Sequence, residues 1–255
     1  MALAHHPSSA TLAARLGVVA RGCTVVSTTP VSPSLMEVVL RGDAAELAGV
    51  PGNDVMVLIA DGATLTRRRF SVRSLDPEAD TMALWICTTH DGPAVRWARA
   101  AGAGDVVDVL GPRGKIPLHQ SALWHLFVGD VSALGAFHRL AQSIPTPSRA
   151  IFVIEIDSPG DALIAQVNEA LAVTAIFVDR NGRAHDDPRG LLNALALLSL
   201  PSDEGHAYLF GEFHVVRAAH TVLRDRGLAP EQISLKAYYR VGHANGANGE
   251  PAKDS

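Results

Sequence analysis

The sequence predicts two folded domains: a six-stranded antiparallel β-barrel, followed by an α/β domain with a doubly wound parallel sheet. The length of 255 residues suits one or two domains of roughly 150 residues each. Up to about Leu118, short β-like runs are separated by Gly, Pro and Asp, which is typical of a barrel or a sandwich. Beyond Leu118, buried-strand runs alternate with helical segments, which indicates βαβ units and a parallel sheet.

The first half contains six strand-like runs and one short helix. The helix is predicted over Pro93–Ala101, because proline suits the first helical turn. The strands are predicted over Cys23–Thr28, Leu35–Leu40, Val55–Ile59, Arg69–Ser74, Met82–Thr88 and Val106–Val109. The barrel domain is therefore expected to span residues 1–118, with its boundary between Ile116 and Ser121.

The second half contains five strand-like runs and four helical segments, which predict a domain over residues 119–242. The strands are predicted over Leu123–Val128, Ala150–Ile156, Ala172–Val178, Ala207–Phe210 and Ile233–Tyr239. The helices are predicted over Ala133–Ser143, Ala162–Ala170, Arg189–Leu198 and Phe213–Arg226. Gly227 is placed to end the last helix. Residues 243–255 are rich in Ala, Asn and Gly and are expected to form a disordered tail.

Composition excludes several classes of protein. The 22 Lys and Arg residues against 26 Asp and Glu residues leave a formal charge of −4, so no global attraction to nucleic acid is expected. No segment reaches about 18 uncharged apolar residues, so no membrane span is expected. Cys23 and Cys87 are too few for a disulfide framework, which favours a reducing, cytoplasmic location. The eleven histidines lack a His-Glu-x-x-His spacing, and no metal site is predicted.

A run of arginines lies inside the fourth predicted strand. Side chains alternate across a strand, so Arg67, Arg69, Ser71 and Arg73 share one face, whereas Arg68 and Phe70 share the other. One interpretation is a sheet face whose charges are solvated. The other is a ligand site, in which Arg68 binds a phosphate, the Phe70 ring stacks on a flat cofactor and Ser71 donates a hydrogen bond to it.

The segment from His90 to Trp97 forms a second candidate. Gly92 allows a ligand to approach the backbone closely, and the free N–H groups of the helix that starts at Pro93 and Ala94 suit a pyrophosphate. Asp91 is expected to cap this helix. The alternative is an ordinary capped helix, with His90 as a hydrogen-bonded structural residue.

The strand ends of the second domain form a third candidate, because open α/β sheets bind ligands at the carboxyl ends of their strands. Glu155 and Asp157 end the second strand and are suited to accept ribose hydroxyls. The other candidates end the first and fourth strands or open a helix: Gly129, Asp130, Ser132, Gly211 and Glu212. A Gly-x-Gly-x-x-Gly fingerprint is missing, and a solvated strand end is the alternative for each acidic residue.

These blocks together resemble a known family. The run from Arg68 to Arg73, which includes Val72, resembles the Arg-x-Tyr-Ser/Thr-x-Arg flavin motif of ferredoxin-reductase-like enzymes, and the His90–Ala98 block resembles the phosphate loop of siderophore-interacting proteins. The similarity continues in the family's order through Gly104-Asp105, Gly111-Pro112-Arg113-Gly114, Gly129-Asp130, Ser132-Ala133-Leu134, Gly211-Glu212 and Tyr239-Arg240-x-Gly242. It extends from about Gly22 to Gly242.

The sequence departs from the family pattern at several positions. Phe70 replaces the usual Tyr, which keeps a stacking face but removes a hydroxyl. Val131 replaces a common acidic residue, Tyr239 replaces a Trp, and Phe177 lies near another frequent Trp. These departures affect the expected nicotinamide-nucleotide site and the choice of electron donor more than the expected flavin site.

The resemblance implies an FAD-dependent ferric-siderophore reductase with no catalytic side chain, because the flavin carries the electrons. The implied donor is NADH, NADPH or reduced ferredoxin, and the default oligomeric state is a monomer. Lys236 and Arg240, four residues apart on the last strand, are expected to share a face and to contact the anionic chelate, with Arg67, Arg69 and Arg73 as further members of a positive patch. A solvent-facing lysine is the alternative for Lys236. Two other functions stay open: a flavin or electron-transfer reductase with a different acceptor, and a flavin-binding redox sensor.

Overall fold

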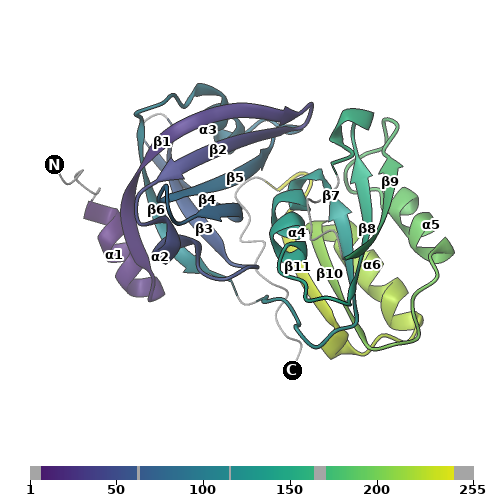
Figure 1. Cartoon of the computed structure of the whole chain (residues 1–255). Coiled ribbons are helices and arrows are strands. Elements are labelled where there is room, and N and C mark those ends of the chain that lie inside the picture. The colour runs from purple at the N-terminus through teal and green to yellow at the C-terminus, as the bar shows by residue number, and fades with distance from the viewer. Residues whose placement is uncertain (1–6, 62–63, 115, 164–170, 244–255) are drawn as a thin grey trace. The chain divides into compact units, whose positions relative to one another are not determined.

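The computed structural model describes residues 7–61, 64–114, 116–163 and 171–243. Contacts divide the chain into two compact units, Met1–Pro117 and Leu118–Ser255 (Figure 1). Each unit is described by itself. Among the described residues, no helix combines the length and the apolar character needed to cross a membrane.

The first unit is a closed barrel of six antiparallel strands, as predicted. Its strands are β1 (Val19–Ser32), β2 (Leu35–Arg41), β3 (Asp54–Asp61), β4 (Thr64–Asp76), β5 (Thr81–Cys87) and β6 (Val106–Arg113). Around the barrel they follow the order β1-β2-β5-β4-β3-β6. Strand β4 pairs with β3 from Thr64 to Ser71, and it pairs with β5 only from Val72 onward. One edge of its arginine-rich half is therefore not hydrogen-bonded to β5.

Alternating apolar side chains fill the barrel. Val55, Val57 and Ile59 of β3 point inward and are at most 1% exposed, each contributing about 1.5–3 kcal/mol through burial. The helix predicted over Pro93–Ala101 is found as α3 (Pro93–Ala100). Two helices were not predicted. Helix α1 (Pro7–Leu16) packs Ala13 against the outer side chains Met56 and Leu58, and α2 (Ala44–Ala48) buries Leu47 in the core.

The second unit contains a parallel five-stranded sheet. Its strands are β7 (Trp124–Asp130), β8 (Arg149–Ile156), β9 (Ala172–Asp179), β10 (Gly205–Glu212) and β11 (Ile233–Tyr239), in the order β11-β10-β7-β8-β9. The strand order runs outward in both directions from the adjacent pair β7 and β10. The carboxyl ends of this pair are therefore the point at which open α/β sheets bind ligands.

Helices cover both faces of this sheet, as a doubly wound fold requires. Helices α5 (Arg189–Leu197) and α6 (Phe213–Asp225) pack on one face against Leu126 and Leu209. On the other face, Phe137 of α4 (Leu134–Ala141) packs against Phe127 and Phe210, with ring centroids 5.3 and 5.2 Å from its own.

Most helix bounds agree with the prediction to within one or two residues. Helix α6 ends just before Gly227, whose φ of +94° favours glycine. The helix predicted over Ala133–Ser143 is found as α4 (Leu134–Ala141), and a 3₁₀ turn, η1 (Val131–Ala133), precedes it. Two further 3₁₀ turns are η2 (Pro159–Asp161) and η3 (Pro230–Gln232). Residues 164–170 of the helix predicted over Ala162–Ala170, and residues 244–255 of the predicted tail, lie outside the described residues.

Three histidines lie together near the amino ends of β7 and β10. The rings of His119 and His206 stack with centroids 3.5 Å apart, and His125 is the register partner of His206. The Tyr208 hydroxyl packs beside them and accepts a hydrogen bond from the backbone N–H of His119 at 2.8 Å. Burial lowers the pKa of His125 to about 4 and the pKa of His206 to about 3. The fold therefore holds both rings neutral at physiological pH.

Acidification is expected to destabilise the α/β unit through these histidines. Below pH 6.5 these histidines bind protons in the unfolded chain, whereas in the folded protein they stay neutral down to about pH 4 for His125 and pH 3 for His206. The free energy of unfolding therefore falls as pH falls from 6.5 to about 3. At pH 5 the loss is about 2 kcal/mol per histidine. Guanidinium unfolding at pH 8 and pH 5 measures it, with His206→Gln as the variant and the exposed His214→Gln as its control. An equal pH effect in both variants would show that His206 does not carry the dependence.

Candidate functional site

An aromatic wall forms where β4 meets α3. The half-buried rings of Phe70 and Trp97 are stacked, with centroids 6.1 Å apart and planes 29° apart. Both rings rest on the barrel core, to which Val72 also belongs at 1% exposure. Because neither ring is fully buried, the wall leaves an aromatic surface on which a flat ring system can stack.

The polar residues of the predicted motif lie on both sides of β4. Arg68 and Phe70 lie opposite the inward residues Val57 and Val55, so both belong to the same side of β4. Arg68 is half-buried, and its Nη1 donates to the backbone oxygen of Arg67 at 2.9 Å. Ser71 lies on the other side, opposite Asp54. The structure therefore brings Arg68, the candidate phosphate ligand, and Phe70, the candidate stacking residue, to the same side of β4.

Arg73 is engaged within the barrel. Its guanidinium carbon lies 4.9 Å from the centroid of the Trp85 ring, and the Trp85 indole donates to Glu37 at 2.9 Å. Burial lowers the pKa of Arg73, and the Glu37 carboxylate opposes that change. A register shift between Val72 and Ser74 marks a β-bulge at this point. Arg73 contributes a cation–π contact to the fold.

The start of α3 has the geometry of an anion site. No side chain caps it, so the expectation that Asp91 would do so is wrong: Asp91 pairs with Arg96 at 3.4 Å. A Cβ placed on Gly92 would meet nothing within 4 Å, which shows open space in front of the helix. Pro93 opens the first turn, and the N–H groups that follow it are left without a side-chain acceptor. His90 lies half-buried just before this turn.

At the carboxyl edge of the parallel sheet, Asp130 joins three segments. Its Oδ1 accepts from the backbone N–H of Ser132 at 2.9 Å, which caps η1. Its Oδ2 accepts from the Glu212 N–H at 3.2 Å and from the Tyr239 hydroxyl at 3.1 Å. A Cβ on Gly211, whose φ is +145°, would lie 2.7 Å from this oxygen. Asp130 therefore requires glycine at position 211.

Neighbouring groups complete this edge. Gly129 allows β7 and β10 to approach, since a Cβ there would lie 2.0 Å from the Phe210 oxygen. Glu212 is fully buried and caps α6 by accepting from the N–H groups of His214 and Val215. Its Oε1 accepts from Val241 N–H at 3.2 Å. The structure thus gathers the candidates Gly129, Asp130, Ser132, Gly211 and Glu212 at the point where the strand order reverses, and it uses both carboxylates to hold that edge together.

Glu155 and Asp157 are bound by an arginine that the sequence reasoning missed. Arg180, which follows β9, donates to Glu155 at 2.6 Å and to Asp157 at 2.7 Å. Arg183 also reaches Glu155, at 3.2 Å. Glu155 and Arg180 are at most 3% exposed, whereas the side chains of Asp157 and Arg183 are 22% and 27% exposed. Asp157 and Arg183 are the members of the network that a ligand can reach.

The charges of this network balance. Burial raises the pKa of Glu155, and the two guanidiniums oppose that rise. Burial acts to lower the pKa of Arg180, but the two carboxylates outweigh it and the pKa lies above its ordinary value. Two carboxylates are thus neutralised by two guanidiniums. The sequence did contain a signal for this network, because Asp179, Arg180 and Arg183 directly follow the run predicted as the third strand of this domain.

Lys236 and Arg240 contact different aromatic rings. Lys236 is 7% exposed, so it is not a solvent-facing lysine, and its Nζ lies 5.3 Å from the centroid of Tyr238. The Arg240 guanidinium lies 5.0 Å from the centroid of Phe213. A register shift between β10 and β11 near Glu212 breaks the alternation that placed Lys236 and Arg240 on one face.

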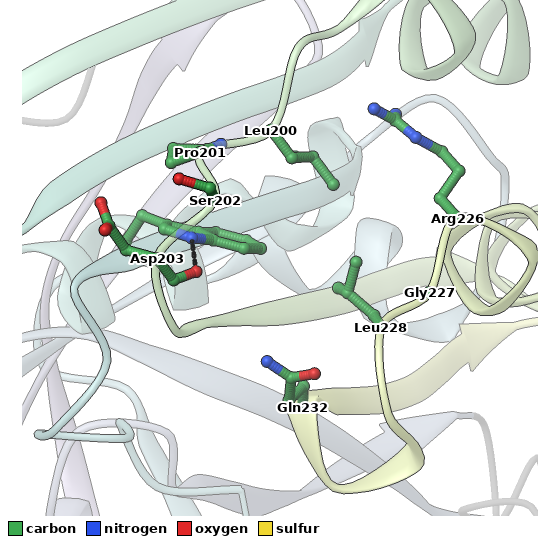
Figure 2. Close-up of a pocket in the computed structure, with 9 residues that line it drawn as sticks. Leu200, Pro201, Ser202, Asp203, Arg226, Gly227, Leu228 and Gln232 are labelled. Atoms are coloured by element: carbon green, nitrogen blue, oxygen red, sulfur yellow. Dashed lines mark hydrogen bonds between the residues drawn. The ribbon is translucent and has the colours of Figure 1, made fainter.

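A pocket of about 380 Å³ lies at the amino ends of the strands, away from these residues (Figure 2). Its polar groups bind backbone: the Trp124 indole donates to the Asp203 oxygen at 2.8 Å, Gln232 donates to the Gly205 oxygen at 3.1 Å, and Arg226 donates to the Leu195 oxygen at 2.6 Å. None of the predicted site residues lines it.

Known proteins resemble both units. A model of the siderophore-interacting FAD-binding domain matches residues 53–116, and a model of the siderophore-interacting protein matches residues 122–242. Ferric vibriobactin reductase ViuB of Vibrio cholerae is 25% identical, over 69% of this chain and 65% of its own length. The NADPH-dependent ferric-chelate reductase of Escherichia coli is also 25% identical, over 60% of this chain and 58% of its own length.

Solved structures share the fold. A siderophore utilization protein from T. fusca has a TM-score of 0.79 and 24% identity, covering 89% of this chain and 95% of that one. The ferredoxin-NADP⁺ reductase of Plasmodium falciparum has a TM-score of 0.69 and 10% identity, covering 85% of this chain and 95% of that one. The barrel followed by a parallel sheet is therefore a ferredoxin-reductase-like arrangement of elements.

Proposed function

Because this chain belongs to the siderophore-interacting protein family, we propose that it is an FAD-dependent reductase that passes electrons to a ferric siderophore and releases ferrous iron in the cytoplasm. The observation that carries the proposal is the half-exposed Phe70–Trp97 wall beside an uncapped helix start. Relatives named as ferric vibriobactin reductase and ferric-chelate reductase support it.

The barrel residues suit an FAD. The Phe70–Trp97 wall offers a stacking surface for the ring system, and Ser71 is a hydrogen-bond donor on the same strand. Arg68 and the first-turn N–H groups after Gly92 suit the diphosphate, because guanidiniums and free backbone N–H groups both bind phosphate oxygens. His90 is the remaining candidate contact before this turn. Together these residues bind and orient the cofactor.

When bound, FAD supplies the redox chemistry, accepting an electron pair and delivering single electrons to iron. No acid or base is required of the protein for this transfer. Siderophores hold Fe(III) through hard oxygen donors, and a lower charge on the metal weakens those bonds. Reduction of Fe(III) to Fe(II) is therefore sufficient to release the iron.

The carboxyl edge of the sheet is the proposed donor site. Asp130 and Glu212 hold it together, and Asp157 and Arg183 are the parts that a nucleotide can reach. Because Arg180 neutralises Glu155 and Asp157, this edge does not repel a 2′-phosphate, and we propose that NADPH is accepted as well as NADH. Reduced ferredoxin is the third donor to be tested.

The chelate is proposed to bind through cationic side chains. Of the two candidates on the last strand, Arg240 is the more exposed, since Lys236 is buried at 7%. Among the barrel arginines, Arg69 and Arg73 already have protein partners, namely Asp54 and the Trp85 ring. A local positive patch can attract an anionic chelate to a protein of net charge −4, because screening limits distant charges.

The proposal predicts a yellow protein with an FAD absorption spectrum. NADH, NADPH or reduced ferredoxin should bleach the flavin band, and a ferric siderophore with a ferrous trap should restore it while the trap develops colour. Reoxidation by other acceptors but by no ferric chelate would point to a general flavin reductase. A flavin that no donor reduces would point to a redox sensor, and a protein that binds no FAD would refute the proposal.

A further inference from the structure

Most of the candidate residues at the carboxyl edge of the parallel sheet are hidden from solvent. The buried ones are Gly129, Asp130, Glu155, Gly211 and Glu212. Asp130, at the point where the strand order reverses, is only 5% exposed. Open α/β sheets bind their ligands at this point, so a nucleotide contacts Asp130 only after the side chains above it have moved. Those side chains therefore affect the affinity for a nucleotide donor.

Tyr239 reaches Asp130 from one edge of the sheet. It ends β11, and β10 lies between β11 and β7. The Tyr239 hydroxyl nevertheless donates to the Oδ2 of Asp130, at the end of β7, at 3.1 Å. The Tyr239 side chain therefore crosses the carboxyl end of β10.

His185 reaches the same place from the opposite edge. It belongs to the segment 180–188, which follows β9. Its Nε2 lies 3.9 Å from the Oδ1 of Asp157, just beyond the end of β8. Its ring meets the Tyr239 ring edge-on, with centroids 6.5 Å apart and planes 71° apart. The segment after β9 thus meets the end of β11 above the strands that lie between them.

Hydrogen bonds and ion pairs hold this segment in place. The N–H of Arg183 donates to the Arg180 oxygen at 3.0 Å, and the N–H of Asp187 donates to the Ala184 oxygen at 3.1 Å. The guanidiniums of Arg180 and Arg183 are also bound to the buried Glu155 carboxylate. The fold therefore fixes the position of the histidine between these two turns.

We propose that His185 and Tyr239 form a cover over the carboxyl end of β7, and that His185 limits the affinity for nicotinamide nucleotides. The inference rests on the donor site proposed above. Asp157 and Arg183 stay partly exposed and are available to a nucleotide while the cover is closed. Contact with Asp130 requires the open form, and a ligand that needs a minor form binds more weakly by the fraction of molecules in that form.

Titration of the purified holoprotein with NADP⁺, followed by calorimetry, tests the cover without reductase activity. H185A removes the ring that contacts Tyr239, and we expect it to bind NADP⁺ more tightly than the wild type by about fivefold or more, because the open fraction rises. H214A, at an exposed histidine of the same unit, is the matched control and should bind NADP⁺ as the wild type does.

H185F identifies the contact that closes the cover, because it keeps a ring but removes the nitrogen that faces Asp157. Wild-type affinity in H185F supports the proposal and assigns the closure to the ring contact with Tyr239. The affinity of H185A in H185F supports it and assigns the closure to the contact with Asp157. In steady-state assays with NADPH, H185A should lower KM by the same factor as the Kd of NADP⁺, and by more than it changes kcat. A loss of stability alone would not tighten binding.

Weaker binding in H185A would make His185 a nucleotide ligand and would overturn the proposal. Equal binding in H185A and the wild type, or no detectable binding in either, would also overturn it. Y239F, which removes the hydrogen bond to Asp130, is the second variant if H185A does not fold, and it should also tighten binding. Tighter NADP⁺ binding in H185A without any reduction of ferric chelates would support the cover and refute the proposed acceptor.

Discussion

Replacing Arg180 with Met is expected to destabilise the α/β unit by about 3–5 kcal/mol, because it leaves the Glu155 carboxylate buried beside a single remaining guanidinium. At roughly 2–4 °C per kcal/mol, the thermal midpoint should fall by about 10 °C. Guanidinium unfolding and thermal denaturation at pH 8 both measure the loss.

The chain provides a matched control for this substitution. Arg189 pairs with Asp187 at the same distance of 2.6 Å, but its side chain is 79% exposed, so Arg189→Met should leave stability almost unchanged. Equal losses in Arg180→Met and Arg189→Met would show that burial does not set the strength of the Glu155–Arg180 pair.

A pH series tests the cause of the loss. Burial already raises the pKa of Glu155, and removing Arg180 removes the main opposing charge, so the variant should protonate Glu155 at a higher pH than the wild type. The penalty exists only while Glu155 is ionised. The stability difference between variant and wild type should therefore shrink as pH falls, and a difference independent of pH would assign the loss to packing.

Replacing Arg68 with Ala is expected to release FAD. Removing a charged hydrogen bond to a phosphate costs about 1.5–3 kcal/mol, which corresponds to roughly a tenfold to hundredfold weaker affinity. The side chain is half-buried on the same side of β4 as Phe70, so its loss should leave the barrel core intact. The flavin-to-protein ratio after purification, and an FAD titration followed by flavin fluorescence, measure the effect.

An exposed arginine of the same unit serves as the comparison. Arg99 lies in the last turn of α3, and Arg99→Ala should keep the wild-type flavin content. Full occupancy in Arg68→Ala would remove Arg68 from the proposed phosphate contacts and would leave the start of α3 as the remaining candidate.

The local sequence was sufficient to locate many elements. Strand β11 has the predicted bounds Ile233–Tyr239, and α3, α5 and α6 end within one residue of the prediction. These elements have signals within a few residues of their ends, such as Pro93 at a helix start and Gly227 after a helix end. The ordered family blocks likewise located the Phe70 and Gly92 segments without any three-dimensional information.

Elements whose stability depends on distant partners were missed. Helix α1 is held by Met56 and Leu58 on the outside of the barrel, and α2 buries Leu47 among side chains from several strands. Strand β1 extends over fourteen residues, because both β2 and β6 pair with it, whereas its own pattern predicted only Cys23–Thr28. In each case the free energy of the element comes from contacts that the neighbouring sequence does not contain.

The order and type of the elements, and the position of the flavin motif on the fourth strand, follow from hydrophobic periodicity, turn residues and motif order, all of which are local properties. The partners of charged side chains depend on the tertiary structure. Arg180 lies more than twenty residues from the Glu155 that it neutralises, and a β-bulge separates Lys236 from the face of Arg240. An ion pair and a register shift each join residues of different strands, and the strength of an ion pair depends on its burial. The local sequence contains neither the pairing of strands nor the burial of a side chain, so only the tertiary structure decides them.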